Sequence, residues 1–467
     1  MMHLVRRTRT EVRCDPARVI SRPFDPGQEG LILGLSRAQS VMERVMRLSD
    51  EAVTQILAQT LAAYATRHDD LRANFRRNFQ VVAHGDPVTH PELSQDRVEL
   101  IGAYFTQEYA IEGAALFNPS IVMAPDQSGC GPDELRFIMS LRAVGEGHMS
   151  SIEFRSGVLG ADDSVVLDAA SPHLSTGERS DLPTAWGFQE HGPSVEQADR
   201  VEHPLPPDTA IKLVSSSYQL TFAPTSTLSE RVLFPSIGAE AHGLEDARLV
   251  RFVEDDGAVS YFGTYTAYNG ALVTPYVLQT EDFQTFRMRP MLGEAAKNKG
   301  MALFPRRING KLFCLSRWDR ESVSVATFED GAGWCHAQVL QAPEEPWELV
   351  QMGNCSSPIE LPEGWLVLTH GVGPMRSYSI GAMLLDLDDP TKVIGVLATP
   401  LLMPAEAERE GYVPNVVYSC GALVHGDSLA LPYGCSDDSV RFAFVDLPAL
   451  IAHLSDPAHV PLDTVDL

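Results

Sequence analysis

A repeated pattern of short strands is the feature that most limits the folds open to this chain. Five segments open with a short strand that carries small or polar residues, and the last four begin roughly 55 residues apart: FNPSIVM (117–123), LEDARLV (244–250), MALFPRR (301–307), CSSPIEL (355–361) and VPNVVYS (413–419). Each is followed by a turn and two further β-rich runs. Repeats of about 50 residues with three or four antiparallel strands are typical of propeller blades. The sequence therefore predicts an all-β, five-bladed β-propeller. A pair of β-sandwiches is the alternative, which the equal spacing disfavours.

The N-terminal part of the chain has a different pattern. In LSDEAVTQILAQTLAAY, Ser49 is a good N-cap and apolar residues follow at helical spacing. RHDDLRANFRRNF continues this periodicity, and we interpret its arginines as a solvated helix face rather than a ligand or subunit contact: Arg72, Arg76 and Arg77. We expect a helical N-terminal region over residues 1–105 and the propeller over 106–467. A stretch rich in Pro, Ser and acidic residues, 157–210, is expected to be a long inter-blade insertion.

Composition excludes several classes of function. A formal net charge of -26 argues against a nucleic-acid partner, because such proteins need a basic face. The basic start, MMHLVRRTRT, has no apolar run behind it, so it does not read as a secretory signal, and no stretch of 18 apolar residues predicts a membrane helix. The seven scattered cysteines form no CxxC pair. They indicate reduced thiols in a cytoplasmic protein, and no metal site is expected.

Polar residues recur at matching positions of the repeats, and a propeller would bring these strand ends around one mouth. The ends of the second strands carry Arg142, Tyr268, Arg317, His370 and Asp437, and the first strands carry or adjoin Asn118, Glu245, Asp246 and Lys299. Each residue alone has an ordinary structural interpretation. Arg317 could pair with Asp319, Tyr268 could pack across strands, and Asp437 could shape a turn with Asp438. Their convergence at equivalent positions is what favours a pocket for a polar ligand.

Four stretches resemble glycoside hydrolase family 130, which contains inverting β-mannoside phosphorylases and some β-mannosidases. They are GLEDARLVRF with YFGTYTAYNG, NKGMALFPRRINGKLFCLSRWD, GWLVLTHGVG with YSIGAMLLDLDDPTKVIG, and EGYVPNVVYSCGAL with LPYGCSDD, and the resemblance covers roughly residues 115–450. The family fold is a five-bladed propeller. The resemblance implies that Asp246 is the general acid, supported by Glu245, and that inorganic phosphate is held by Lys299, Arg317, His370 and Tyr378.

Further substrate contacts are implied at Asp437, which matches a position that binds sugar hydroxyls, and substrate-binding roles are expected for Arg142, Asn118, Glu245 and Tyr268. The chain departs from the family's usual Glu-Asp-Pro-Arg at one place, where Ala247 replaces the proline. That change removes a fixed φ but leaves the carboxylate and Arg248. For Asp246 to act as an acid its pKa must be raised, which burial near Glu245 would favour and Arg248 would oppose.

The chemistry separates three hypotheses. A phosphorylase uses phosphate, already anionic, as the nucleophile, so it needs cationic donors and no base. We therefore expect an enzyme that converts β-mannosides, either manno-oligosaccharides or mannosyl-glucose, to α-mannose 1-phosphate and a shortened sugar. Its partners would be a small carbohydrate and phosphate as co-substrate, with no other cofactor, and the N-terminal helices are a candidate oligomer interface. The alternatives are an inverting β-mannosidase, with Glu294 or Glu360 as a base, and a sugar-binding propeller without catalysis.

Overall fold

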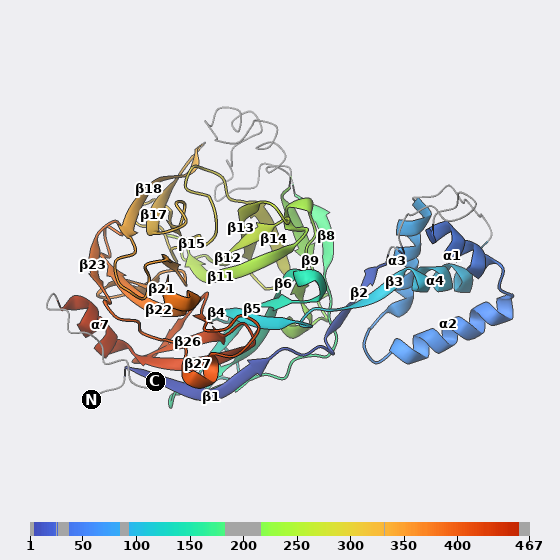
Figure 1. Ribbon diagram of the computed structural model, residues 1–467, viewed down its shortest axis with the longest axis horizontal. Coiled ribbons are helices and arrows are strands. Elements are labelled where there is room, and N and C mark those ends of the chain that lie inside the picture. The colour runs from blue at the N-terminus through green and yellow to red at the C-terminus, as the bar shows by residue number, and fades with distance from the viewer. Residues whose placement is uncertain are drawn as a thin grey trace. The chain divides into compact units, whose positions relative to one another are not determined.

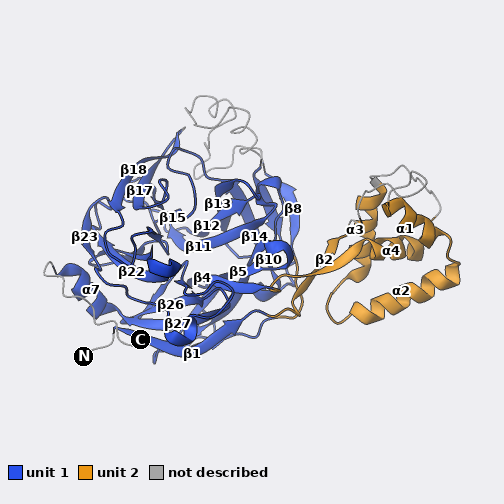
Figure 2. Ribbon diagram, in the orientation of Figure 1, with its two compact units in different colours: residues 1–14, 114–170, 176–467 blue, residues 15–113, 171–175 orange. Residues whose placement is uncertain are grey.

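The computed structural model describes residues 4–24, 26, 37–84, 93–182, 216–330 and 332–456. The chain divides into two compact units, coloured separately in Figure 2. Unit 1 contains residues 1–14, 114–170 and 176–467, and unit 2 contains residues 15–113 and 171–175. These bounds differ from the predicted division at residue 105, because the first residues form a strand of unit 1 and a small sheet extends unit 2 to residue 113. Much of the predicted insertion, 183–210, lies outside the described residues.

Unit 2 consists of helices and one two-stranded sheet. The helices are α1 (Arg37–Met46), α2 (Asp50–Tyr64), α3 (Leu71–His84) and α4 (Gln95–Tyr104), and the sheet pairs β2 (Val19–Pro23) with β3 (Thr106–Ala110). Ser49 caps α2 as predicted, since its Oγ accepts a hydrogen bond from the Ala52 N–H at 3.3 Å. The helices bury one apolar cluster that includes Val53, Leu57 and Phe75. No described helix is long and apolar enough to span a membrane.

The arginines of α3 are solvated, as the sequence suggested, but Arg72 and Arg76, whose side chains are 47% and 42% exposed, also pair with a buried carboxylate. Arg76 Nη1 lies 2.6 Å from Oε1 of Glu99 on α4, and Arg72 pairs with the other oxygen of the same carboxylate. Glu99 is fully buried, and a buried carboxylate is costly unless it is paired. Arg72 and Arg76 therefore join α3 to α4. Arg77 does behave as a surface residue and donates to Asn74 within its own helix.

Unit 1 is built from antiparallel strand meanders. The first contains β4 (Ala115–Met123), β5 (Leu135–Val144) and β6 (Ser150–Leu159), with β7 (Val165–Leu167) and β10 (Val232–Leu233) beside β6. The second contains β11 (Gly243–Val253), β12 (Val259–Tyr268), β13 (Val273–Thr280) and β14 (Thr285–Pro290), extended by β9 (Tyr218–Thr221) and β8 (Glu178–Asp181). One parallel pair, Gly243 with Ser150, links the two meanders into a single sheet. Gly243 has φ of 139°, and a Cβ there would lie 2.7 Å from the Ser150 nitrogen, so the position requires glycine.

Three further sheets complete unit 1. The third meander contains β15 (Ala302–Leu303), β16 (Phe313–Ser316), β17 (Val323–Glu329) and β18 (Gly333–Gln341). The fourth contains β19 (Gln351–Asn354), β21 (Gly364–Val372), β22 (Tyr378–Leu385) and β23 (Val393–Val396), with β20 (Ile359–Leu361) beside β21. The fifth contains β24 (Val417–Tyr418), β26 (Ser428–Cys435) and β27 (Ser439–Asp446), with β25 (Leu423–His425) beside β26, and helix α7 (Leu447–Ser455) follows it.

The first described strand completes the sheet of the last meander. Strand β1 (Val5–Arg13) pairs antiparallel with β27, so that Val5 lies opposite Val445 and Arg13 opposite Ser439. This pairing covers an edge of β27 that would otherwise present unpaired backbone groups. Short 3₁₀ helices occur in the connections: η1 (Glu146–His148), η2 (Leu228–Glu230), η3 (Gly238–Glu240), η4 (Pro374–Arg376) and η5 (Glu406–Glu408).

The hydrophobic core of unit 1 lies between successive meanders. On β21, Trp365 and Val367 belong to a cluster shared with the third meander, whereas Leu366 and Leu368 belong to one shared with the fifth. Because successive residues of a strand point to opposite faces, one strand contributes to two cores. The fifth meander also packs against the first, where the rings of Phe137 and Phe442 are 6.1 Å apart. In Figure 1, β4, β11 and β15 lie toward the middle of unit 1 and β18, β23 and β1 at its outside. The mostly β character predicted from the sequence is confirmed.

Candidate active site

Unit 1 contains a cavity of about 190 Å³ where most of the predicted polar residues converge. Eight of them line it: Asn118, Arg142, Asp246, Lys299, Arg317, His370, Tyr378 and Asp437. Six further residues that the sequence had not assigned to the site complete the lining: Phe117, Gln351, Arg376, Val413, Val416 and Tyr418. The lining residues come from all five meanders, so the repeat brings distant parts of the sequence to one place.

Two β-bulges determine where the central carboxylate lies. The pairing of β11 with β12 shifts register at 245–248, and the pairing of β4 with β5 shifts at 117–120. Asp246 and Asn118 lie within these bulges with φ of 55° and 51°, a left-handed conformation that Asp and Asn adopt at lower cost than most residues. Because a bulge re-aims a side chain, the two side chains meet, and Asn118 Nδ2 donates to Asp246 Oδ1 at 2.6 Å.

Arg142 on β5 binds both members of the acidic pair. Its Nη2 lies 2.8 Å from Glu245 Oε1 and its Nη1 lies 3.1 Å from Asp246 Oδ1. Its Nε donates to Ser150 Oγ at 3.0 Å. Lys299 pairs with the second oxygen of Glu245. Glu245 is buried and does not line the cavity itself. It pairs with two cations at the cavity wall, Arg142 and Lys299.

The third and fourth meanders supply the other candidate phosphate donors. Arg317 follows β16, and its Nη1 donates to Nε2 of His370 at 3.3 Å. Burial lowers the pKa of His370 well below its usual value, and the nearby Arg317 and Arg248 add to this effect. The imidazole is therefore neutral and accepts the hydrogen bond. Tyr378 stacks on His370 with ring centroids 6.0 Å apart. The Nε of Arg317 is buried and has no hydrogen-bond partner among the described residues.

The pKa of Asp246 is lowered, contrary to the expectation from the sequence. Burial raises the pKa of this carboxyl, but the positive charges of Arg142, Arg248 and Lys299 lower it by more. The expectation was wrong because it weighed one arginine against burial, whereas three cations surround the group. An anion bound beside these cations would offset their charge and raise the pKa of Asp246 toward the range that proton donation needs.

Asp437 shows the opposite behaviour. It lies in the turn between β26 and β27 with φ of 54°. Burial raises its pKa to about 7, and the charge of Asp246 adds to this, while Arg142 and Arg376 oppose it. Its neighbour Asp438 instead pairs with Arg13 at the surface, at 3.0 Å. The two aspartates share one turn but have different surroundings: Asp437 lines the cavity, whereas Asp438 forms an ion pair at the surface.

Arg248 is a buried support for the cavity. It donates to the backbone oxygen of Asp246 at 2.9 Å, to the backbone oxygen of Cys355 at 3.0 Å and to the hydroxyl of Tyr418 at 2.8 Å. These contacts join the second meander to the fourth and fifth. Ala247, at the family's usual proline position, packs in the core. The bulge forms with alanine at this position.

Besides Glu245, one more predicted residue, Tyr268, does not line the cavity. The hydroxyl of Tyr268 donates to the backbone oxygen of Gly270 at 2.8 Å, and its ring packs against His242. Tyr268 therefore packs within its own strand and turn, which is the ordinary structural interpretation of a tyrosine at this place. Arg376 is the most evident residue that the sequence analysis missed. The sequence did contain a signal for Arg376. The short helix η4 follows β21 in the same way that η1 follows β5, and the dipeptide Val-Gly precedes both helices.

Comparison with known proteins places the chain among enzymes. The sequence model of glycoside hydrolase family 130, described as β-1,4-mannooligosaccharide phosphorylase, matches residues 223–455. The 1,2-β-oligomannan phosphorylase of Thermoanaerobacter sp. is 33% identical over 226 residues, covering 47% of this chain and 74% of that protein. The chain belongs to glycoside hydrolase family 130. The resemblance noted in the sequence is thereby confirmed, as is the expectation of an enzyme of the family's phosphorylase type.

Other relatives agree with this assignment. The β-1,2-mannobiose phosphorylase of Listeria innocua serovar 6a is 32% identical over 227 residues, and the match covers 46% of this chain and 61% of that protein. A solved structure of a β-1,2-mannobiose phosphorylase from Listeria innocua with β-1,2-mannobiose is 20% identical, with a TM-score of 0.47, over 74% of this chain and 93% of that one. The family match includes the positions of Asp246, Lys299, Arg317, His370 and Asp437 but not unit 2.

Proposed function

We propose that this protein catalyses inverting phosphorolysis of β-mannosides, manno-oligosaccharides or mannosyl-glucose, to α-mannose 1-phosphate and a shortened sugar. The observation that carries the proposal is one cavity that combines a buried aspartate with the cationic side chains of Lys299, Arg317 and Arg376, a combination suited to an anionic co-substrate. Homologues that match this chain are named as phosphorylases of β-1,2-linked and β-1,4-linked mannosides and of mannosyl-glucose. The mannoside class is common to these names, and the linkage differs among them.

The proposed fold of the catalytic unit is a five-bladed β-propeller. Five antiparallel meanders follow one another, each pair of neighbours sharing a hydrophobic interface, with the fifth against the first. In that arrangement the starts of the inner strands would surround one axis. Asn118, Asp246 and Tyr418 belong to such strands of three meanders and share the cavity, which supports the assignment.

In the proposed mechanism, phosphate binds to Lys299, Arg317, His370 and Tyr378. A phosphate oxygen attacks the anomeric carbon from the face opposite the leaving oxygen, so one C–O bond forms as the glycosidic C–O bond breaks. Asp246 supplies the proton that the leaving oxygen takes up, through a sugar hydroxyl as the family resemblance implies. Phosphate beside Lys299 offsets the charge that lowers the pKa of Asp246, so binding of the nucleophile would prepare the acid.

The remaining residues position these groups. Asn118 and Arg142 both hydrogen-bond Oδ1 of Asp246, which leaves Oδ2 as the oxygen that faces substrate. Asp437, with a pKa of about 7, can accept or donate a hydrogen bond at neutral pH and suits the sugar hydroxyls. Glu245 would hold Lys299 and Arg142 in place before phosphate arrives.

The two alternatives have less support. A hydrolase needs a carboxylate base for water, and neither expected candidate lines the cavity. Glu360, an exposed residue of β20, pairs with Arg306 at 2.7 Å, and Glu294 accepts a hydrogen bond from the N–H of His336 on β18. Of the described residues that line the cavity, the carboxylates are Asp246 and Asp437. A sugar-binding protein without catalysis does not need a buried aspartate surrounded by three cations, as Asp246 is here.

The test is to incubate the protein with β-1,2-, β-1,3- and β-1,4-mannobiose and mannosyl-glucose, with and without phosphate. We expect α-mannose 1-phosphate, detected by phosphorus NMR, only when phosphate is present. Asp246→Asn should abolish it, whereas Tyr268→Phe, a matched change outside the cavity, should not. Equal cleavage in phosphate-free buffer would favour the hydrolase, and no cleavage of any mannoside would reject the proposed reaction.

A further inference from the structure

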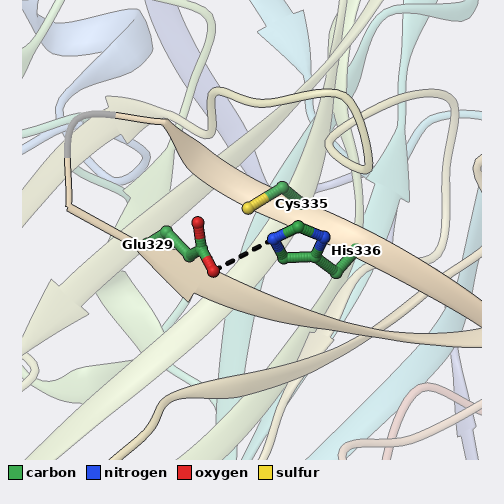
Figure 3. A group of neighbouring side chains, drawn as sticks. All are labelled: Glu329, Cys335 and His336. Carbon is green, nitrogen blue, oxygen red and sulfur yellow. Dashed lines mark ion pairs between the residues drawn. The ribbon is translucent and has the colours of Figure 1, made fainter.

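A second cluster of reactive side chains lies on the hairpin formed by β17 and β18. The sheet runs β15-β16-β17-β18, so β18 is its last strand, and it lies at the outside of unit 1 in Figure 1. At this hairpin the side chains of Glu329, Cys335 and His336 turn toward one another (Figure 3). One donor atom from each lies within 4.8 Å of the others. None of the three lines the catalytic cavity.

A β-bulge is the reason that the two neighbours Cys335 and His336 share one face. Successive residues of a regular strand point to opposite faces. Here the pairing of β17 with β18 shifts between Val325 and Thr327, so one residue on β17 faces two on β18. His336 lies in the bulge with φ of 53°, a conformation that is uncommon and strained for histidine. The bulge turns the imidazole to the side of the thiol.

The three donors match the ligand preferences of one metal. Thiolate sulfur, imidazole nitrogen and carboxylate oxygen all bind Zn²⁺, whose bonds of about 2.0–2.3 Å place tetrahedral ligands roughly 3.3–3.8 Å apart. His336 Nε2 is already 3.0 Å from Glu329 Oε1. Sulfur and imidazole together disfavour Mg²⁺ and Ca²⁺, which take oxygen ligands. Small side-chain rotations would therefore bring the three donors to zinc-binding distances.

The surroundings of the cluster favour a cation. Cys335 is buried, while the side chains of His336 and Glu329 are 65% and 50% exposed, so an ion can enter from solvent. A second carboxylate, Glu294, accepts a hydrogen bond from the His336 N–H at 3.2 Å. Among the described residues, neither Glu329 nor Glu294 forms an ion pair with a lysine or arginine. The negative charge at this end of the hairpin is thus left without a permanent cationic partner.

We propose that Glu329, Cys335 and His336 bind one Zn²⁺, with water as the fourth ligand, and that the ion ties the end of β17 to β18. Binding converts the thiol to a thiolate: the S–H bond breaks, the S–Zn bond forms and the proton passes to solvent. The site is separate from catalysis, and its role is to stabilise the hairpin. The alternative is a surface ion pair between His336 and Glu329 that covers a cysteine of the core.

The test titrates the metal-free full-length protein with Zn²⁺ by calorimetry and with Co²⁺ by absorption spectroscopy. We expect one ion per chain, and a Co²⁺ complex that shows tetrahedral d–d bands and a sulfur-to-cobalt charge-transfer band. Cys335→Ser should remove the charge-transfer band. His336→Asn should weaken Zn²⁺ binding by at least roughly 10-fold, the smallest loss that even an outer-shell partner causes, without disturbing the backbone, because Asn tolerates the left-handed conformation. Cys130→Ser, at a partly exposed cysteine elsewhere in unit 1, is the matched control and should bind as wild type.

Three results would overturn the proposal: no stoichiometric binding, an unchanged cobalt spectrum in Cys335→Ser, or unchanged Zn²⁺ affinity in His336→Asn. Because Cys335 is buried, its variant could fail to fold, which circular dichroism would reveal. His336→Asn then decides the question alone, since its side chain is largely exposed and its loss leaves the core intact. Loss of binding in Cys130→Ser would likewise reject the site.

Discussion

Replacing Asp437 by asparagine should stabilise the catalytic unit, and by more at pH 8 than at pH 5. The carboxyl is partly buried and its pKa is raised to about 7, whereas an aspartate in an unfolded chain has a pKa of about 3.9. A raised carboxyl pKa means that the folded state binds the proton more tightly than the unfolded state. The contribution of this carboxyl to the stability of the folded state is therefore complete at a pH below its pKa in the unfolded chain. The contribution is lost as the pH rises through its pKa in the folded protein.

The two pKa values give the size of the effect. Between pH 5 and pH 8 the wild-type protein should lose about 2.5 kcal/mol of stability through this one group. Asparagine has a similar shape and does not titrate, so the variant escapes this loss. For a unit of this size the change corresponds to a difference in melting temperature that grows by roughly 3 °C between the two pH values. Such an increase in protein stability is expected where a polar residue is kept for function at a cost in stability.

The assay is differential scanning calorimetry of wild type and Asp437→Asn in matched low-salt buffers at pH 5, 6, 7 and 8, following the transition of unit 1. Asp438→Asn is the matched control, because it removes one acidic charge from the next residue, which pairs with Arg13 at the surface. The measured quantity is the difference in melting temperature between Asp437→Asn and wild type. If this difference is the same at every pH, or shrinks as the pH rises, the burial and charge argument for this carboxyl is refuted.

Three further predictions concern the cavity. Lys299→Met should raise the KM for phosphate by about tenfold or more, through loss of a charge-assisted hydrogen bond, with a smaller change in the KM for the sugar, as measured by initial rates. Gly353→Ala should also weaken phosphate binding, because its Cβ would lie 2.7 Å from Cε1 of His370 and 3.0 Å from Cδ of Arg317; an unchanged KM for phosphate would contradict this. Tyr268→Phe should change kcat/KM less than about twofold, because its hydroxyl only donates to its own turn. A large loss of kcat/KM in this variant would mean that the tyrosine reaches substrate.

The strand repeat was predictable because it is a local pattern repeated along the chain. The cap at Ser49 was predictable for the same reason, since a cap is made within one turn of its helix. The long-range pairings were not. Arg72 and Arg76 are about half-exposed, as their helix pattern indicated, but nothing in that helix shows that a buried Glu99 also faces them from α4. Tyr268 looked like a site residue because a repeat position does not tell where a hydroxyl at a strand end points.

The sequence by itself determined the strand repeat, the helical N-terminal part, and most of the cavity lining: the Glu-Asp-Ala-Arg segment with many of the basic and polar residues that converge on it, though not Arg376. Only the tertiary structure decided their electrostatic state. The pKa of Asp246 depends on three cations and that of Asp437 on burial, and these distances exist only once the meanders pack together. The bulge at His336 is a similar case, because it joins donors that a regular strand would separate. Charge interactions and burial depend on positions in space, and the order of residues fixes those positions only through the complete fold.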